Sequence, residues 1–173
     1  MTKLTVVSAA LGLLIYAFFL CVSIRKFGLR RSYSSFAPYW KEEVKIHNVN
    51  LWSLVTIVSA ILLAFGMIEV GSGSNFQFLG FLTPVYLVVV ALTPEYQTNI
   101  GQRIAHLLFT YLCVIGFLLY LCFVLKLGTL LIAPAIVFLA IGFASQSLRV
   151  CGILWLEQVL FLTAFLVPLI PAA

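Results

Sequence analysis

Six long apolar runs alternate with short polar stretches along the 173 residues of the chain. A helix needs about 20 residues to cross the ~30 Å hydrocarbon core of a bilayer, and the six runs come close to that length. The pattern predicts an all-α protein, a polytopic integral membrane bundle of about six transmembrane helices in a single domain that covers residues 1–173. The predicted spans are 4–24, 49–68, 76–92, 103–125, 129–147 and 151–170.

The third run, residues 76–92, is the shortest and contains Pro84 near its centre. Proline removes one backbone hydrogen bond from a helix, and a short span has to be stretched to reach both membrane surfaces. Two interpretations are therefore open. The run either crosses the membrane fully, which gives six spans, or enters and leaves on the same side as a re-entrant segment.

Positive charge is concentrated between the first two spans, in residues 25–48. Cytoplasmic loops carry an excess of Lys and Arg, so this loop is expected in the cytoplasm and both termini outside. Six crossings add Arg103 and Arg149 to the cytoplasmic side, which makes eight basic residues there and two outside, Lys3 and Lys126. A re-entrant third run gives a poorer distribution of seven against three. The loop itself contains Arg25, Lys26, Arg30, Arg31, Lys41 and Lys45.

The same loop, residues 25–48, mixes aromatic side chains with its positive charge. This mixture is typical of a segment that lies at the membrane interface, where Arg30 and Arg31 attract anionic lipid. Pro38 is favourable near the start of a helix and predicts a short one there. The aromatic side chains expected at headgroup level are Phe27, Tyr33, Phe36, Tyr39 and Trp40.

The composition agrees with a membrane environment. Hydrophobic residues make up 64% of the chain and the mean hydropathy is +1.18, which excludes a globule surrounded by water. The net charge of +5 comes largely from one loop, so we expect no nucleic-acid partner. Short loops, small size and the lack of an Asn-x-Ser/Thr acceptor favour a bacterial inner (plasma) membrane.

The sequence contains no recognisable catalytic, nucleotide-binding or metal-binding motif. There is no GxSxG motif, no HExxH motif and no Gly-rich phosphate loop, and the chain contains no Asp. The four cysteines, Cys21, Cys113, Cys122 and Cys151, lack the CxxC spacing of zinc or redox sites. We therefore assign no catalytic residues, metal or cofactor, although an acid-base reaction on a lipid through His106 and Glu157 stays open.

Two ionisable residues inside the predicted spans are of particular interest, His106 and Glu157. An acidic residue at the middle of a transmembrane helix costs roughly 2.5–3.5 kcal/mol, so Glu157 is expected to face protein, a partner or a water-filled space. It is interpreted either as an internal partner of His106, Arg103 or Arg149, or as a protonatable or cation-binding site. His106 is either a hydrogen-bonded residue at the interface or a proton-handling or ligand-binding residue.

Polar residues recur at every third position at the start of the second span. A spacing of three lags the helical turn by about 60° per step, so the set winds around the helix, and only consecutive members share a side. The side chains either bond to their own or a neighbouring helix or form a polar track into the bundle. The set consists of His47, Asn50, Ser53, Thr56 and Ser59.

With six spans, the polar candidates converge in the cytoplasmic half of the bundle. This convergence predicts a cytoplasm-facing polar cavity that binds or moves a small solute, a proton or a lipid. The alternative is a non-catalytic scaffold or assembly subunit, and an enzyme acting on lipid is a third hypothesis. Expected partners are membrane lipids and either a second copy or another membrane protein. The candidates are Glu157, His106, Arg103, Arg149 and Glu95, with His47, Asn50, Ser53 and Thr56.

Overall fold

The computed structural model describes residues 3–44, 50–94, 98–126 and 160. Every regular element among these residues is helical, with five α-helices and one short 3-10 helix, η1. In chain order the elements are α1 (Lys3–Phe27), η1 (Tyr33–Phe36), α2 (Ala37–Glu43), α3 (Leu51–Val70), α4 (Phe78–Ala91) and α5 (Ile100–Phe123).

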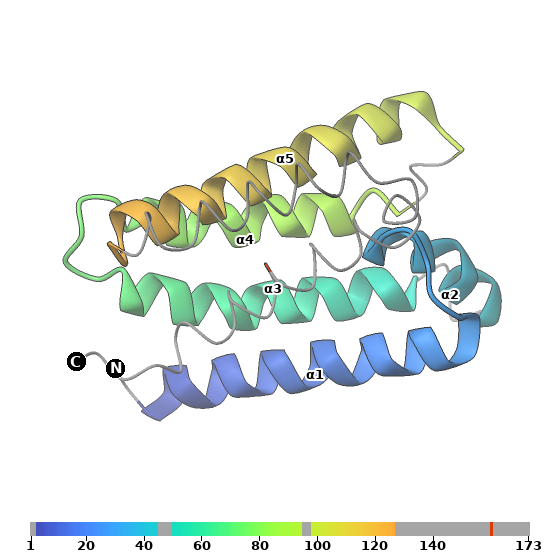
Figure 1. The fold of residues 1–173 in the computed structure, drawn as a ribbon, viewed down its shortest axis with the longest axis horizontal. Helices are drawn as coiled ribbons and strands as arrows, with labels where there is room; N and C mark the ends of the chain where they lie inside the picture. The colour runs from blue at the N-terminus through green and yellow to red at the C-terminus, as the bar shows by residue number, and fades with distance from the viewer. Residues whose placement is uncertain (1–2, 45–49, 95–97, 127–159, 161–173) are drawn as a thin grey trace.

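The four long helices run alternately up and down (Figure 1). Along the bundle, α1 packs on α3, α3 on α4, and α4 on α5. One end of the bundle carries η1, α2 and the connection between α4 and α5, and we call it the η1–α2 end. The opposite end carries the turn between α3 and α4, and we call it the 71–77 end.

Three helices are long and apolar enough to cross a membrane. They are α1 with 25 residues, α3 with 20 and α5 with 24. Helix α4 has only 14 residues, which at 1.5 Å per residue is about 21 Å, so it is shorter than the hydrocarbon core. Pro84 lies inside α4 without ending it.

These elements confirm the predicted all-α class for the described residues, including a helix in each of the first four predicted spans. The boundaries differ by a few residues at either end. The predicted spans 129–147 and 151–170 lie outside the described residues except for Leu160. The number of spans and their orientation therefore stay predictions.

Buried residues of α1 recur three or four positions apart and form one stripe along the helix. This spacing keeps side chains on a single helix face, and the small members of the stripe permit a close approach of α3, on which α1 mainly packs. The stripe consists of Thr5, Ala9, Gly12, Tyr16, Phe19 and Ser23.

The segment with η1 and α2 is docked against α1 and α3 by hydrogen bonds. Trp40 Nε1 donates to Ser23 Oγ at 2.8 Å, and Ser23 Oγ donates in turn to the Phe19 carbonyl at 2.7 Å. On the other side, Asn50 Nδ2 donates to the Ala37 carbonyl at 3.0 Å. The Asn50 side chain also accepts from Trp52 N, so the same residue caps α3 and holds α2.

This docking changes the interpretation of the loop aromatics. Tyr33, Phe36 and Trp40 were predicted at headgroup level, but they are buried in the protein core. The Tyr33 ring lies 5.0 Å from Tyr16 of α1 and 5.5 Å from Trp52 of α3 between ring centroids, and the Trp40 ring lies 5.0 Å from Phe19 of α1. The helix predicted from Pro38 is present as α2.

Two glycines bring α4 close to its neighbours. A Cβ at Gly80 would lie 2.8 Å from the Met67 carbonyl oxygen of α3, and a Cβ at Gly116 would lie 2.8 Å from Thr83 Oγ1 of α4. Next to the first contact, Tyr120 Oη donates to the same Met67 carbonyl at 2.8 Å. The absence of side chains at these two positions therefore sets the spacing of α3, α4 and α5.

A candidate ligand cavity between α3, α4 and α5

A cavity of about 70 Å³ lies between α3, α4 and α5, with η1 at one side. Seven of the fifteen lining side chains are apolar, and the other eight carry a neutral hydroxyl, a thiol, an indole or an imidazole, although the surface that they expose to the cavity is mainly carbon. The lining residues are Tyr33, Ser34, Trp52, Thr56, Leu63, Thr83, Pro84, Leu87, Val90, His106, Thr110, Cys113, Val114, Phe117 and Leu160.

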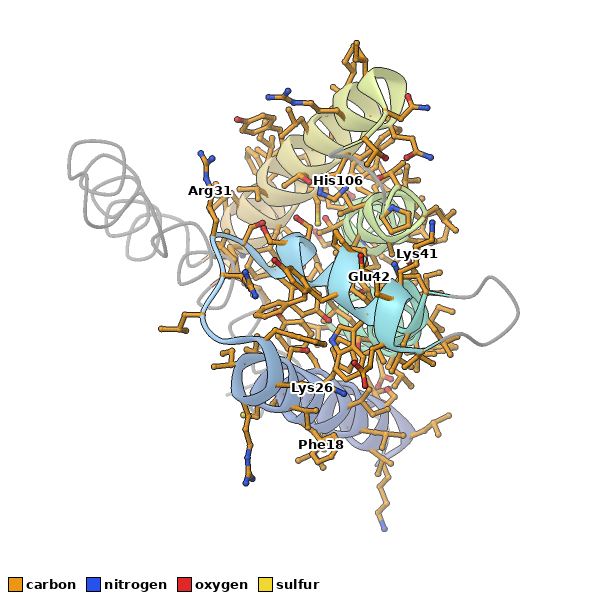
Figure 2. The ribbon with its side chains drawn as sticks, turned by 90° about the vertical axis from the view of Figure 1, so that its right-hand side faces the viewer. Phe18, Lys26, Arg31, Lys41, Glu42 and His106 are labelled. Carbon is orange, nitrogen blue, oxygen red and sulfur yellow. The ribbon has the colours of Figure 1, made fainter. Side chains whose placement is uncertain are left out.

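His106 is the ionisable residue of greatest interest in this lining, and it lies between α4 and α5 (Figure 2). It is buried, and its Nδ1 lies 3.1 Å from Thr93 Oγ1, just beyond the end of α4. The Thr93 hydroxyl donates its proton to the Val90 carbonyl at 3.0 Å. Because a hydroxyl has a single proton, Nδ1–H is then the donor to the Thr93 oxygen.

The start of α5 determines where His106 falls. Asn99 caps the helix, since its Oδ1 accepts from Gly101 N at 2.9 Å and from Gln102 N at 3.3 Å. The helix thus starts three residues before the predicted span 103–125. His106 then lies two turns into α5, on the side that packs against α4.

Two of the threonine hydroxyls around the cavity bond to the backbone of their own helix. Thr56 Oγ1 donates to the Trp52 carbonyl at 2.8 Å and lies 3.4 Å from the Tyr33 hydroxyl. Thr110 Oγ1 donates to the His106 carbonyl at 2.7 Å. Such bonds use the polar atoms locally and leave mainly carbon facing neighbouring groups, which is common for Ser and Thr in apolar helices.

Two hydrogen-bond donors of the lining residues are not satisfied in this way. Trp52 Nε1 and Thr83 Oγ1 are buried and have no hydrogen-bond partner among the described residues. Cys113 Sγ bonds to the Thr83 carbonyl at 3.5 Å but not to its hydroxyl. Unpaired buried polar groups are rare because each costs about 1–3 kcal/mol, so both donors call for an explanation.

The structure brings two of the residues predicted from the sequence together at the cavity, His106 and Thr56. Three others lie elsewhere. Arg103 is exposed on the first turn of α5, Asn50 caps α3, and Ser53 is half-buried with a hydroxyl that has no partner within the described part of the chain. Glu157, Arg149, Glu95 and His47 lie outside the described residues.

Several of the polar residues around the cavity were not predicted from the sequence. Trp52, Thr83 and Thr110 belong to apolar runs, and single polar residues of this kind are ordinary in transmembrane helices. Cys113 was considered only for the CxxC spacing, which it lacks. Gly116 could have pointed to this site from the sequence, because a lone glycine in an apolar helix marks a close helix contact. In the structure, Gly116 faces Thr83.

Within residues 3–44, 50–94 and 98–126, no group of three or more His, Cys, Asp or Glu residues is positioned to hold a metal ion. Comparisons with protein-family models, with curated proteins and with solved structures find no match to this chain. Only the geometry of the site therefore bears on its function.

Proposed function

We propose that this chain is a six-span integral membrane protein, with both termini outside, that binds a small and mainly apolar molecule in the cavity between α3, α4 and α5. The membrane part of the proposal is supported by three apolar helices of 20 to 25 residues. The orientation is supported by the positive charge of the η1–α2 end, which the positive-inside rule assigns to the cytoplasm. The cavity extends toward that end, since Tyr33 and Ser34 of η1 line it.

The single observation that carries the proposal is the cavity itself, because packed protein interiors contain few spaces larger than a water molecule. At about 70 Å³ it is smaller than the roughly 300–1,000 Å³ of sites for drug-sized ligands. It suits a molecule of a few heavy atoms or one end of a longer lipid chain. The unpaired donors of Trp52 and Thr83 favour a ligand that carries an acceptor oxygen.

Binding of a ligand is enough to account for the cavity. Moving that ligand across the membrane would need more than a single bundle of this size can provide. Transport needs alternating access to the two sides, and small transporters commonly reach this by assembling several copies or repeats. If the protein moves its ligand, we therefore expect a homo-oligomer. Membrane lipids are the expected source of the ligand, because the helices are immersed in them.

The proposal is tested by native mass spectrometry of the protein released from mild detergent, with a matched pair of variants. Val114→Phe fills the cavity, since Val114 lines it. Its chain neighbour Ile115 is exposed on the outer side of α5, so Ile115→Phe adds a similar volume where nothing is displaced. We expect the wild-type protein and Ile115→Phe to carry a defined small molecule that Val114→Phe has lost.

The outcome that contradicts the proposal is equal retention of the bound molecule by all three proteins, or no bound molecule in any of them. If all three instead carry one protein partner in a fixed ratio, the scaffold hypothesis replaces the binding hypothesis. Circular dichroism and the oligomeric state of each variant serve as controls for folding.

A further inference from the structure

A second pocket, of about 400 Å³, lies on the surface of the η1–α2 end and shares no lining residue with the cavity between α3, α4 and α5. It is formed by the chain that leaves α1 and by one side of η1 and α2. Unlike the first cavity, it carries charges of both signs. Its lining residues are Arg30, Arg31, Ser35, Pro38, Tyr39 and Glu42.

Arg30 is held in place by an aromatic ring. Its guanidinium carbon lies 4.0 Å from the centre of the Tyr39 ring, a distance at which the cation and the ring face attract each other. Its Nε is buried and has no hydrogen-bond partner among the described residues. A guanidinium stays charged and presents its N–H groups as a planar fork that matches phosphate and carboxylate. Because Arg30 lines the pocket, its guanidinium is the group there that suits an anion.

The neighbouring acidic residues differ in their pairing. Glu43 forms a salt bridge with Lys26 at the end of α1, so its charge is balanced within the fold. Glu42 lines the pocket instead, and its side chain is exposed. Figure 2 views this end directly, with Glu42 and Lys41 on α2 in front of the bundle and Arg31 directed away from it. The pocket thus offers a place for an anion at Arg30 and for a cation at Glu42.

The location of the pocket restricts what reaches it. Its lining begins three residues after the end of α1 and continues into α2, which packs on α3. Both α1 and α3 are long enough to cross a membrane. Groups at such helix ends lie at the level of the lipid headgroups. A ligand with a phosphate and a cationic group at this level is a zwitterionic phospholipid.

We propose that the pocket binds the headgroup of an amine-bearing phospholipid, with the phosphate at Arg30 and the ammonium at Glu42, and with Arg31 adding positive charge at the rim. A primary ammonium donates three hydrogen bonds, which suits a carboxylate, whereas a quaternary ammonium donates none. The site is therefore expected to prefer phosphatidylethanolamine over phosphatidylcholine, and over phosphatidylglycerol, which has no ammonium. The proposal does not depend on the cavity between α3, α4 and α5.

The test measures lipid binding to the full-length protein by native mass spectrometry, with each of the three lipids added in equal amount. We expect a preference of about tenfold for phosphatidylethanolamine. Arg30→Gln should lower the binding of all three lipids, and Arg30→Lys should restore only part of it because the planar fork is lost. Glu42→Gln should remove the preference while leaving phosphatidylglycerol bound as well as before or better.

Lys41→Gln is the matched control, because Lys41 lies next to Glu42 on α2, is exposed and does not line the pocket. Its lipid preference should equal that of the wild-type protein. Unchanged binding in Arg30→Gln overturns the site, and an unchanged preference in Glu42→Gln overturns the role of that carboxylate.

Competition by soluble phosphoethanolamine distinguishes the source of the phosphate. Competition that is weak compared with the lipid supports a lipid site, and displacement of the lipid at similar concentration overturns it in favour of a free phosphate compound.

Discussion

The two sides of the bundle use their polar groups differently. Between α1 and α3, polar side chains connect separate segments, as Trp40 does with Ser23 and Asn50 with Ala37. Around the cavity between α3, α4 and α5, the Thr56 and Thr110 hydroxyls bond to their own helix. The hydrogen bonds between segments on this side, Tyr120 to Met67 and His106 to Thr93, lie beside these local bonds. The first side is filled by aromatic rings, and the second encloses a cavity.

This difference separates a structural region from a candidate binding region. A hydrogen bond between segments fixes their relative position, so the α1–α3 side holds η1 and α2 in place. Hydroxyls that bond locally leave an apolar wall, which is suited to contact with an apolar molecule. The predictions below distinguish the two regions by what their residues contribute to stability, from the largest expected effect to the smallest.

Trp40→Ala should have the largest effect. It removes a buried ring that contacts Phe19 and Phe27 and leaves Ser23 without this donor, so we expect a loss of about 3–5 kcal/mol in the free energy of unfolding. Trp40→Phe keeps an aromatic ring and should lose less. Denaturant titration in mild detergent measures both, and equal stability of Trp40→Ala and wild type would show that α2 is not held by this contact.

The glycine contacts should have the next largest effect. Gly80→Ala forces a methyl group against the backbone of α3 at Met67, and Gly116→Ala forces one against the Thr83 hydroxyl, so each should cost about 1–3 kcal/mol. Thr83→Ala removes the clashing atom of the second contact only. The cost of Gly116→Ala should therefore fall in the Thr83→Ala background, while that of Gly80→Ala should not. Equal costs in both backgrounds would refute the assignment.

The contact between His106 and Thr93 should have a smaller effect. His106→Phe keeps much of the side-chain volume but removes the hydrogen bond from Nδ1 to Thr93 Oγ1, so we expect a loss of about 1 kcal/mol. A double-mutant cycle with Thr93→Val measures the coupling between the two residues. Strict additivity of the two single losses would indicate that this hydrogen bond does not stabilise the α4–α5 pair.

Phe18→Ala should have the smallest effect and serves as the reference for lipid-facing positions. Phe18 lies on the side of α1 that points away from the bundle (Figure 2) and is 73% exposed. We expect a change within about 0.5 kcal/mol, as for substitutions that disturb no packed contact. A loss as large as that of Trp40→Ala would mean that this face of α1 is covered by a partner.

Long apolar runs were enough to predict the helices. The first, second and fourth predicted spans correspond to α1, α3 and α5 because an apolar run of that length has few alternatives to a helix. The start of α5 also follows from local chemistry, since Asn99 caps it with its own side chain. Both results depend only on residues that are close in the sequence.

Features that depend on distant residues were not predicted. Tyr33 and Trp40 resemble headgroup residues when only their own loop is considered, and their burial requires Ser23 of α1 and the neighbouring α3. Of the candidate site, His106 and Thr56 were predicted because polar residues are conspicuous in apolar helices. Trp52 and Cys113 were missed because their place at the cavity is set by the packing of three helices.

Xenon binding to crystals of the protein tests the contrast between the two regions most directly, because xenon enters apolar cavities and not packed interfaces. We predict one xenon site between α3, α4 and α5, next to Val114 and Phe117, and none between α1 and α3. The site should disappear in Val114→Phe and persist in Ile115→Phe. Xenon between α1 and α3, or its absence from the cavity of the wild-type protein, would contradict the division into a filled structural side and a ligand-binding side.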